Sequence, residues 1–183
     1  AKELDLNVVV TGKAQLFQRM NGYIVDTFVE SMFSSLIIIS IIMTFIFRSV
    51  KMGFFSMVPN LIPILMGAGV LDLLHKPIDM GCAIVASIAL GIAVDDTIHF
   101  INHYLRERRK GRDIAACLID VMENTGVALI ITNVILVSSF GLFMFGDLVT
   151  NVNFGLLMAL VLTIAMFCDI IFLPLLLLTR YKK

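Results

Sequence analysis

The chain has 183 residues, of which 59% are hydrophobic, and its formal net charge at pH 7 is zero. Its mean hydropathy is +0.97, whereas ordinary soluble domains are only about 45–50% apolar, so the composition excludes an ordinary soluble domain and indicates a membrane protein. The balanced charge offers no electrostatic basis for binding nucleic acid, and no nucleic-acid partner is expected.

The first 30 residues are expected to lead from an extracytoplasmic domain into the membrane. The stretch "LDLNVVV", Leu4 to Val10, predicts a short strand that ends at Thr11-Gly12. Because the sequence offers no partner strand, residues 1–12 are interpreted as the last strand of an extracytoplasmic domain that is encoded upstream or held on another chain. Apolar residues then recur at three- and four-residue steps, so residues 13–30 are predicted to form an amphipathic connecting helix.

Five apolar runs follow, each long enough to cross a bilayer as a helix of about 20 residues. The predicted fold is therefore an all-α integral membrane protein, a five-transmembrane-helix bundle over residues 31–178. In the second run, Pro59, Pro63 and the small residues from Gly67 to Gly69 are expected to permit bending and close helix contact. The five expected spans are approximately Ser31–Phe47, Phe54–Leu74, Met80–Ile101, Thr125–Phe145 and Phe154–Leu178.

Basic residues gather in alternate connections. Arg48 and Lys51 follow the first span, "RERRKGR" follows the third, and residues 179–183 form a basic tail after the fifth. The positive-inside rule assigns these segments to the cytoplasm. We therefore expect a multi-pass protein of the cell inner (plasma) membrane, with an extracytoplasmic amino terminus and a cytoplasmic carboxyl terminus. Apolar residues on one face of residues 112–124 predict a short helix on the cytoplasmic membrane surface.

Two adjacent acids lie inside the third span, in "GIAVDDTIHF". An Asp at the centre of a spanning helix costs about 2.5–3.5 kcal/mol on insertion scales. No Lys or Arg lies inside any of the five expected spans, so an ion pair within this chain does not account for the acids. Two neighbouring carboxyls in a low-dielectric site do not both ionise easily, because desolvation and mutual repulsion oppose it. Asp95 and Asp96 are therefore predicted to form an intramembrane proton relay.

His99 lies four residues after Asp95 and three after Asp96, so the three side chains are expected near one another along one helix face. Imidazole titrates near neutrality and can pass protons on, so His99 is assigned to the relay, with a hydrogen-bonded packing role as the alternative. His103, nearer the basic connection, is expected to be a solvated helix end.

Three polar residues on other spans are candidates to support the relay. Thr132 and Asn133 in the fourth span could hydrogen-bond across to the Asp pair, although such residues also serve as helix-packing contacts. Asp169, in "FCDIIFLPLLLL", is a further buried acid, interpreted either as a second relay member or as the partner of a helix outside this chain.

No cofactor and no metal are expected. His99 and His103 have the i, i+4 spacing of a zinc-binding helix, but Phe100 stands where a metalloprotease needs its catalytic Glu. The three cysteines are scattered and predict neither a disulfide framework nor a metal motif. The expected coupling ion is H⁺, and Na⁺ is not excluded.

The acid-pair segment, "GIAVDDTIHFINHYLRERRKG", resembles the fourth helix of each repeat in the resistance-nodulation-division (RND) superfamily, whose exporters often carry Gly-x-x-Val-Asp-Asp there. "VVVTG" resembles the strand and turn before the second helix, "TGVALIITNVILVSSFGLFMF" the fifth helix, and "NFGLLMALVLTIAMFCDIIFLPLLLL" the sixth. The chain is most similar to the branch of hydrophobe and lipid exporters that includes the mycobacterial large membrane proteins (MMPL) and the sterol-sensing relatives.

This resemblance implies that the chain is helices two to six of one transmembrane repeat, the C-terminal one because it ends in a short basic tail. The implied activity is export of hydrophobic or lipid-like molecules driven by the proton-motive force, not an enzymatic reaction, with the relay acids at Asp95 and Asp96. The implied partners are a companion transmembrane repeat, an extracytoplasmic porter domain, the hydrophobic substrate, membrane lipids and further copies in an oligomer. Multidrug pumps of the superfamily often add an intramembrane Lys from the other repeat, which this chain does not contain.

Three other functions remain open from the sequence. A sterol-sensing-like module that binds lipid and regulates would hold the acids for structural reasons and would work without a proton gradient. The protein-export accessory (SecD/SecF-like) branch of the same superfamily has a related third span but usually lacks the second Asp. An intramembrane aspartyl protease would pair one of the adjacent acids with Asp169, but such enzymes carry Gly-x-Gly-Asp where this chain has "GIAVD".

Overall fold

The computed structural model describes residues 12–73 and 80–181. Within these ranges the chain is built from helices and contains no strand. The predicted strand Leu4–Val10 lies outside the described residues. The elements are α1 (Lys13–Phe47), α2 (Val50–Leu73), α3 (Met80–Arg109), α4 (Ile114–Val121), η1 (Met122–Gly126), α5 (Val127–Gly141), η2 (Leu142–Phe145), α6 (Val149–Phe167), η3 (Cys168–Phe172) and α7 (Leu173–Tyr181).

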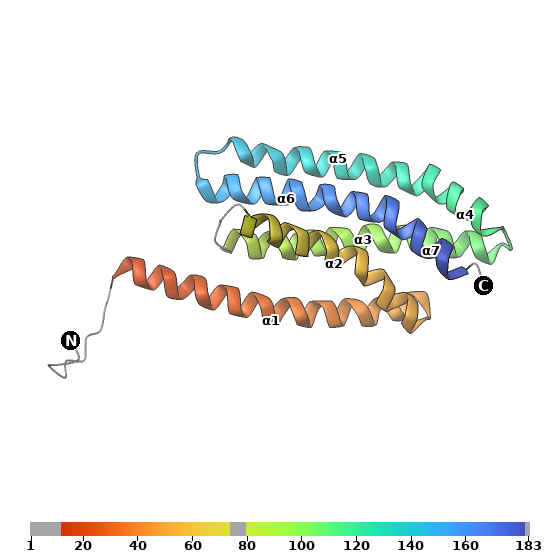
Figure 1. Cartoon of the computed structure of the whole chain (residues 1–183), viewed down its shortest axis with the longest axis horizontal. Coiled ribbons are helices and arrows are strands. Elements are labelled where there is room, and N and C mark those ends of the chain that lie inside the picture. Colours follow the sequence, from red (N-terminus) through yellow and green to blue (C-terminus); the bar gives the residue numbers. More distant parts are fainter. Residues whose placement is uncertain (1–11, 74–79, 182–183) are drawn as a thin grey trace.

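Five helical segments are long and apolar enough to cross a membrane, which confirms the predicted fold class. They lie side by side in a bundle, with α1 along one edge and α5 along the opposite edge (Figure 1). The helix α6 occupies the interior, where it contacts α2, α3 and α5, while α1 contacts α2 and α3. The third span, which carries the acid pair, therefore lies within the bundle. The apolar segments are Gly22–Phe47, Val50–Leu73, Gly81–Arg109, Ile114–Phe145 and Val149–Leu178.

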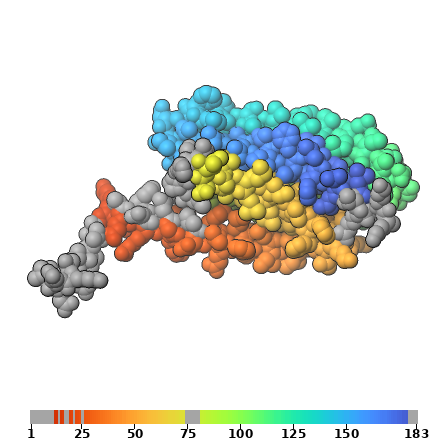
Figure 2. All heavy atoms as spheres, in the orientation of Figure 1, coloured from red at the N-terminus to blue at the C-terminus, as the bar shows by residue number. Residues whose placement is uncertain are grey.

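The predicted connecting helix and the first span form one continuous helix, α1, which runs from Lys13 to Phe47. Figure 2 shows its amino-terminal part extending beyond the other helices, and the Leu16 and Tyr23 side chains there are 64% and 73% exposed. Toward its other end, Met43 and Phe47 are buried in the bundle core. The bundle thus holds α1 mainly by its second half.

Close packing of α2 against α6 depends on Gly67, one of the small residues that the sequence singles out. A Cβ atom at Gly67 would lie 2.6 Å from Cγ2 of Val161 on α6, a separation too short for ordinary van der Waals contact. The helix α2 continues through Pro59 and Pro63, both of which lie within its bounds. The absent side chain at Gly67 lets α2 and α6 approach closely, as is usual between membrane helices.

The chain turns from α3 into α4 at Gly111, whose φ of +81° lies in the left-handed region that favours glycine. The helix α4 begins after Asp113, whose carboxylate accepts the backbone N–H of Ala115 at 3.2 Å and so caps the helix start. A π-helical turn, η1, joins α4 to α5 with helical backbone angles on both sides. The helix predicted over residues 112–124 is therefore continuous with the fourth span rather than separate from it.

A second π-helical turn, η3, joins α6 to α7 in the fifth span. It contains Asp169, and its flanking residues Phe167 and Leu173 keep helical backbone angles. A π-turn adds a residue to one turn of a helix and is frequent at functional sites. The position of Asp169 toward the bundle interior therefore depends on this irregular turn.

Candidate functional site

Asp96 on α3 is buried, with 8% of its surface exposed. Its Oδ2 atom accepts a hydrogen bond of 2.9 Å from Nδ2 of Asn133 on α5. Asn133 is itself 1% exposed, and the same amide nitrogen donates to the Leu129 carbonyl at 3.1 Å. The structure thus brings Asn133 to one member of the acid pair, and the link crosses between two helices.

Asp95 lies in different surroundings from its neighbour. Its side chain is 70% exposed, and Oδ1 is 3.6 Å from Nε2 of His99, whose side chain is 68% exposed. Consecutive residues project about 100° apart around an α-helix. The expected cluster of three side chains therefore divides into the exposed pair Asp95–His99 and the buried acid Asp96, which turns toward Asn133.

Thr132 does not reach the acids by hydrogen bonding. Its hydroxyl is bonded to the carbonyls of Ala128 and Leu129 on its own helix, at 3.1 and 3.0 Å. Threonine hydroxyls in membrane helices commonly donate such hydrogen bonds to carbonyls of the preceding turn. Thr132 nevertheless lines the groove that contains the acid pair.

A groove of about 800 Å³, with polar side chains among a mostly apolar lining, runs between α3 and the α5 side of the bundle. Asp95, Asp96 and His99 line it at one end, and His103 and Arg106 line it toward the end of α3. A smaller hollow of about 290 Å³ shares His99, His103, Arg106 and Thr125 with the groove and adds Asn102. Polar side chains of α3 therefore line these hollows at intervals from the acid pair to the α3–α4 connection.

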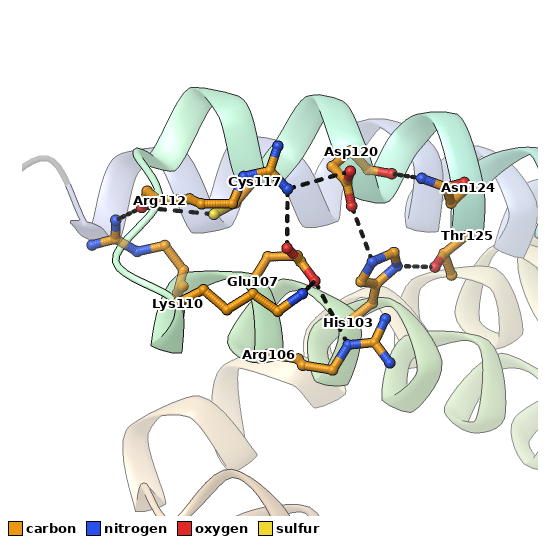
Figure 3. A network of polar contacts seen from close by, with 10 residues as sticks. His103, Arg106, Glu107, Lys110, Arg112, Cys117, Asp120, Asn124 and Thr125 are labelled. Atoms are coloured by element: carbon orange, nitrogen blue, oxygen red, sulfur yellow. Dashed lines mark hydrogen bonds and ion pairs between the residues drawn. The ribbon is translucent and has the colours of Figure 1, made fainter.

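His103 is held in place and is not the solvated helix end that the sequence suggests. Its Nδ1 atom lies 2.6 Å from the Thr125 hydroxyl and its Nε2 atom 3.2 Å from Oδ2 of Asp120, and its side chain is 14% exposed (Figure 3). The cause is the return of α4 and η1 across the end of α3, which brings Asp120 of α4 and Thr125 of η1 to the histidine. Periodicity along α3 alone does not reveal this contact.

Glu107 is a buried acid among basic residues, and the sequence gives little sign of it. Its carboxylate, 5% exposed, contacts Lys110 Nζ at 2.7 Å, an Arg112 nitrogen at 3.0 Å and Arg106 Nε at 3.7 Å (Figure 3). Arg112 also reaches Asp120 at 3.4 Å. Hydrogen bonds from Arg112 to Glu107 and Asp120 raise the pKa of its guanidinium, which stays protonated. The cluster fixes α4 to the end of α3.

The same region holds the candidate metal ligands of the described residues. The ligand atoms of His103, Glu107 and Asp120 lie within 4.8 Å of one another. Arg112 already contacts both carboxylates, and Lys110 contacts Glu107, so cationic side chains neutralise these acids. This arrangement explains the cluster without a metal ion.

Asp169 lies deeper in the bundle, away from the groove lining. It is 2% exposed, and its Oδ1 atom is 3.0 Å from the hydroxyl of Thr97 on α3. That hydroxyl is also 3.1 Å from Oδ1 of Asn60 on α2. Asp169 and Asp96 are close enough for their charges to interact. Thr97 and Asn60 are missing from the sequence-based site, although Thr97 directly follows the acid pair and Asn60 is a polar residue in an apolar run.

Comparisons with known proteins give one family. A model of the MMPL family matches residues 1–180. A candidate membrane protein of Methanocaldococcus jannaschii is 29% identical over 171 residues, which cover 93% of this chain and 43% of the relative. The chain thus spans less than half the length of that relative. No solved structure gives a significant match.

Proposed function

Because the chain belongs to the MMPL family of the RND superfamily, we propose that it is the proton-coupling membrane domain of an exporter of hydrophobic or lipid-like molecules. The observation that carries this proposal is Asp96, a buried carboxyl that is bonded to a neutral amide at the side of the groove between α3 and α5. A carboxyl whose partner is a neutral amide can take up a proton without leaving a partner cation buried and unpaired. Membrane-buried acids of this kind are characteristic of proton pathways.

The groove supplies the route between Asp96 and water. Asp95 and His99 are exposed to it, and His103 and Arg106 continue it toward the α3–α4 connection. This connection is rich in basic residues, so it lies on the cytoplasmic side by the positive-inside rule. Protons therefore pass between the cytoplasm and Asp96 along this side of α3, with Asp95 and His99 as the exchanging groups and Thr132 as a hydroxyl on the wall.

Proton binding at Asp96 changes the contact between α3 and α5. An ionised carboxylate is a stronger hydrogen-bond acceptor than a neutral carboxyl. The Asn133–Asp96 bond is consequently strongest when Asp96 is ionised and weakens when a proton arrives. In this way the proton alters a bond between two spans, which is the minimum that coupling to a conformational change requires.

The remaining parts of the transporter lie outside this chain. The M. jannaschii relative is more than twice as long as the matched region, which supports a companion repeat and an extracytoplasmic porter domain. The exposed Asp95 and His99 side chains give the companion repeat a polar face to cover. We place the protein in the inner (plasma) membrane as part of an oligomer, with H⁺ as the coupling ion, and assign it transport instead of an enzymatic reaction.

The test is proton-gradient-driven efflux from vesicles that contain the full-length protein, with lipid-like fluorescent probes as cargo. Asp95→Asn and Asp96→Asn keep the side-chain size but remove proton binding, and each should reduce efflux to background while the protein folds normally. Asp72→Asn is the matched control, because Asp72 is an exposed acid at the end of α2. Wild-type efflux in both relay variants, or efflux without a proton gradient, would contradict proton coupling through these acids, whereas lipid binding without any efflux by the wild type would favour a lipid-binding regulatory module.

A further inference from the structure

A series of hydrogen bonds near the acid pair connects three of the spans. It runs from Asp169 in η3 to Thr97 on α3, then to Asn60 on α2, and ends at the Ser56 carbonyl. The oxygen–oxygen separations are 3.0 Å for Asp169–Thr97 and 3.1 Å for Thr97–Asn60, and Asn60 Nδ2 is 2.8 Å from the Ser56 carbonyl oxygen. Asp169 is 2% exposed and the Thr97 and Asn60 side chains are 0% exposed. These three side chains are therefore closed off from bulk water.

The direction of these bonds is fixed at the Asn60 end. Only the amide nitrogen of Asn60 can donate to the Ser56 carbonyl, and the reversed amide would place two acceptor oxygens 2.8 Å apart. The Oδ1 atom of Asn60 therefore faces Thr97 and needs a donor. The only hydrogen available on Thr97 is that of its hydroxyl.

The Thr97 hydroxyl thus lies between two acceptors. Asn60 Oδ1 is on one side and Asp169 Oδ1 on the other, and one hydrogen cannot make two full-strength bonds. If Thr97 donates to Asn60, the contact with Asp169 requires a second hydrogen, and only a protonated carboxyl can supply it. The network is complete when Asp169 donates to Thr97 and Thr97 donates to Asn60.

The other oxygen of Asp169 gives an independent indication. Oδ2 is buried and has no hydrogen-bond partner among the described residues. A buried carboxylate with one oxygen unpaired is costly, whereas a neutral carboxyl leaves only a carbonyl oxygen unpaired. None of the ion pairs within residues 12–73 and 80–181 includes Asp169.

The charged and titratable surroundings of Asp169 are simple. Asp96 acts on it from α3, and Cys168 precedes it in the same turn. The facing residue of α2 is the neutral Asn60, and the α6 and α7 segments on either side of η3 contain apolar residues and hydroxyls near it. The neighbouring acid opposes a second negative charge in this part of the bundle.

We propose that Asp169 is a second proton-binding site, distinct from the Asp95–Asp96 pair and occupied by a proton in this structure, and that the Thr97 hydroxyl is a two-position switch between Asp169 and Asn60. When Asp169 gives its proton to the Asp96 carboxylate, the Thr97 hydrogen turns toward the new Asp169 carboxylate. Asn60 on α2 then loses its hydrogen-bond donor, so the departure of the proton from Asp169 changes the hydrogen bonding of α2. The use of this site in coupling rests on the transport proposed above, whereas its occupation by a proton does not.

Infrared spectroscopy of the full-length protein in lipid vesicles at neutral pH tests the occupied site directly. Protonated carboxyls give a carbonyl stretching band, separate from that of carboxylates, that moves in heavy water. Asp169→Asn should remove the contribution of one carboxyl from this band, and the exposed-acid control Asp72→Asn should leave the band unchanged. An Asp169→Asn spectrum with the full wild-type band would overturn the proposal.

A pair of variants at Thr97 gives a second readout that does not depend on the folding of Asp169→Asn. Thr97→Ser keeps the hydroxyl and should leave the band at its wild-type frequency, whereas Thr97→Val keeps the shape and should move it. Equal spectra for the two variants would remove Thr97 as the partner. Loss of the band on addition of sodium chloride, but not choline chloride, at constant pH would assign the site to Na⁺ and overturn the proton site. Because none of these readouts uses efflux, they can fail while transport stands, and the reverse.

Discussion

Asn133 on α5 donates a 2.9 Å hydrogen bond to Asp96 on α3, while its own Oδ1 atom is buried without a partner among the described residues. The amide nitrogen of Asn133 is therefore paired with Asp96, while its amide oxygen is left without a donor. A buried polar atom left unpaired costs about 1–3 kcal/mol. This cost falls at the hydrogen bond that links α5 to the acid pair.

Replacing Asn133 tests the value of that contact. Asn133→Leu keeps the approximate volume but leaves Asp96 without its donor, so we expect a loss of about 1–3 kcal/mol in unfolding free energy together with reduced efflux. Thr132→Val is the neighbouring control, since the Thr132 hydroxyl bonds only within its own helix. Reversible unfolding in mixed detergent measures the stability of both variants. Equal stability of the two variants would show that the Asn133–Asp96 bond contributes nothing.

His99→Ala should leave stability nearly unchanged and alter the pH dependence of efflux. The Asp95–His99 contact is long, at 3.6 Å, and both side chains are mostly exposed. Exposed ion pairs contribute at most about 1 kcal/mol, so the fold does not depend on this one. If imidazole exchanges protons with Asp95, its loss should shift the pH optimum while water keeps some activity. An unchanged optimum would exclude His99 from the relay.

Glu107→Gln should loosen the attachment of α4 to α3. The substitution removes the negative charge that Lys110 and Arg112 share, and it leaves these cations facing a neutral amide. We expect a lower Tm and faster proteolysis at the α3–α4 connection. Glu123→Gln, at an exposed acid of η1, is the control and should match the wild type. Protection of the connection in Glu107→Gln would contradict the role of the cluster.

Two glycines of α2 provide a matched test of helix packing. Gly67→Ala places a methyl group against Val161 and should destabilise the bundle by about 1–3 kcal/mol, as overpacked cores do. Gly69→Ala meets nothing within 4 Å and should be neutral or stabilising by up to about 1 kcal/mol, because alanine is the better helix former. The order of the two unfolding free energies decides the matter, and a reversed order would contradict the close α2–α6 contact.

Topology can be tested with single cysteines in a background without the native ones. Arg109, at the end of α3, and Asp147, between η2 and α6, are both exposed and are expected on opposite sides of the membrane. Arg109→Cys should react with an impermeant thiol reagent only from the cytoplasmic side, and Asp147→Cys only from outside. The opposite labelling would reverse the orientation and the proposed direction of proton flow.

The spans were predictable because length and hydropathy alone determine whether a helix can cross a bilayer. The acid pair was likewise visible, since Asp95 and Asp96 interrupt an apolar run. The sequence treats the two as a single site, but the direction of each side chain depends on which helix packs where. Asp96 faces Asn133 only because α5 lies on that side of α3.

The site residues that the sequence did not reveal were missed for the same reason, because their contacts depend on how the helices pack. Thr97 and Asn60 are 37 positions apart, and their contact arises only when α2 packs against α3. Glu107 stands among arginines and lysines, so its charge is hidden in a segment that reads as basic. His103 loses its expected solvation because the next helix, α4, returns across it. Each error concerns a contact between helices, which periodicity along one helix does not encode.

The two π-helical turns are local irregularities in otherwise regular helices, much as a dislocation is a local irregularity in a crystal. Each is a single irregular turn within an otherwise α-helical span, and its position along the helix determines which way the neighbouring side chains point. Each one-residue step of η3 along the helix would rotate the residues that it passes by about 100°, so a single step is enough to turn Asp169 away from Thr97. With η1 in the fourth span and η3 in the fifth, such a step would change the side chains that these two spans turn toward α3 while the helices stay packed.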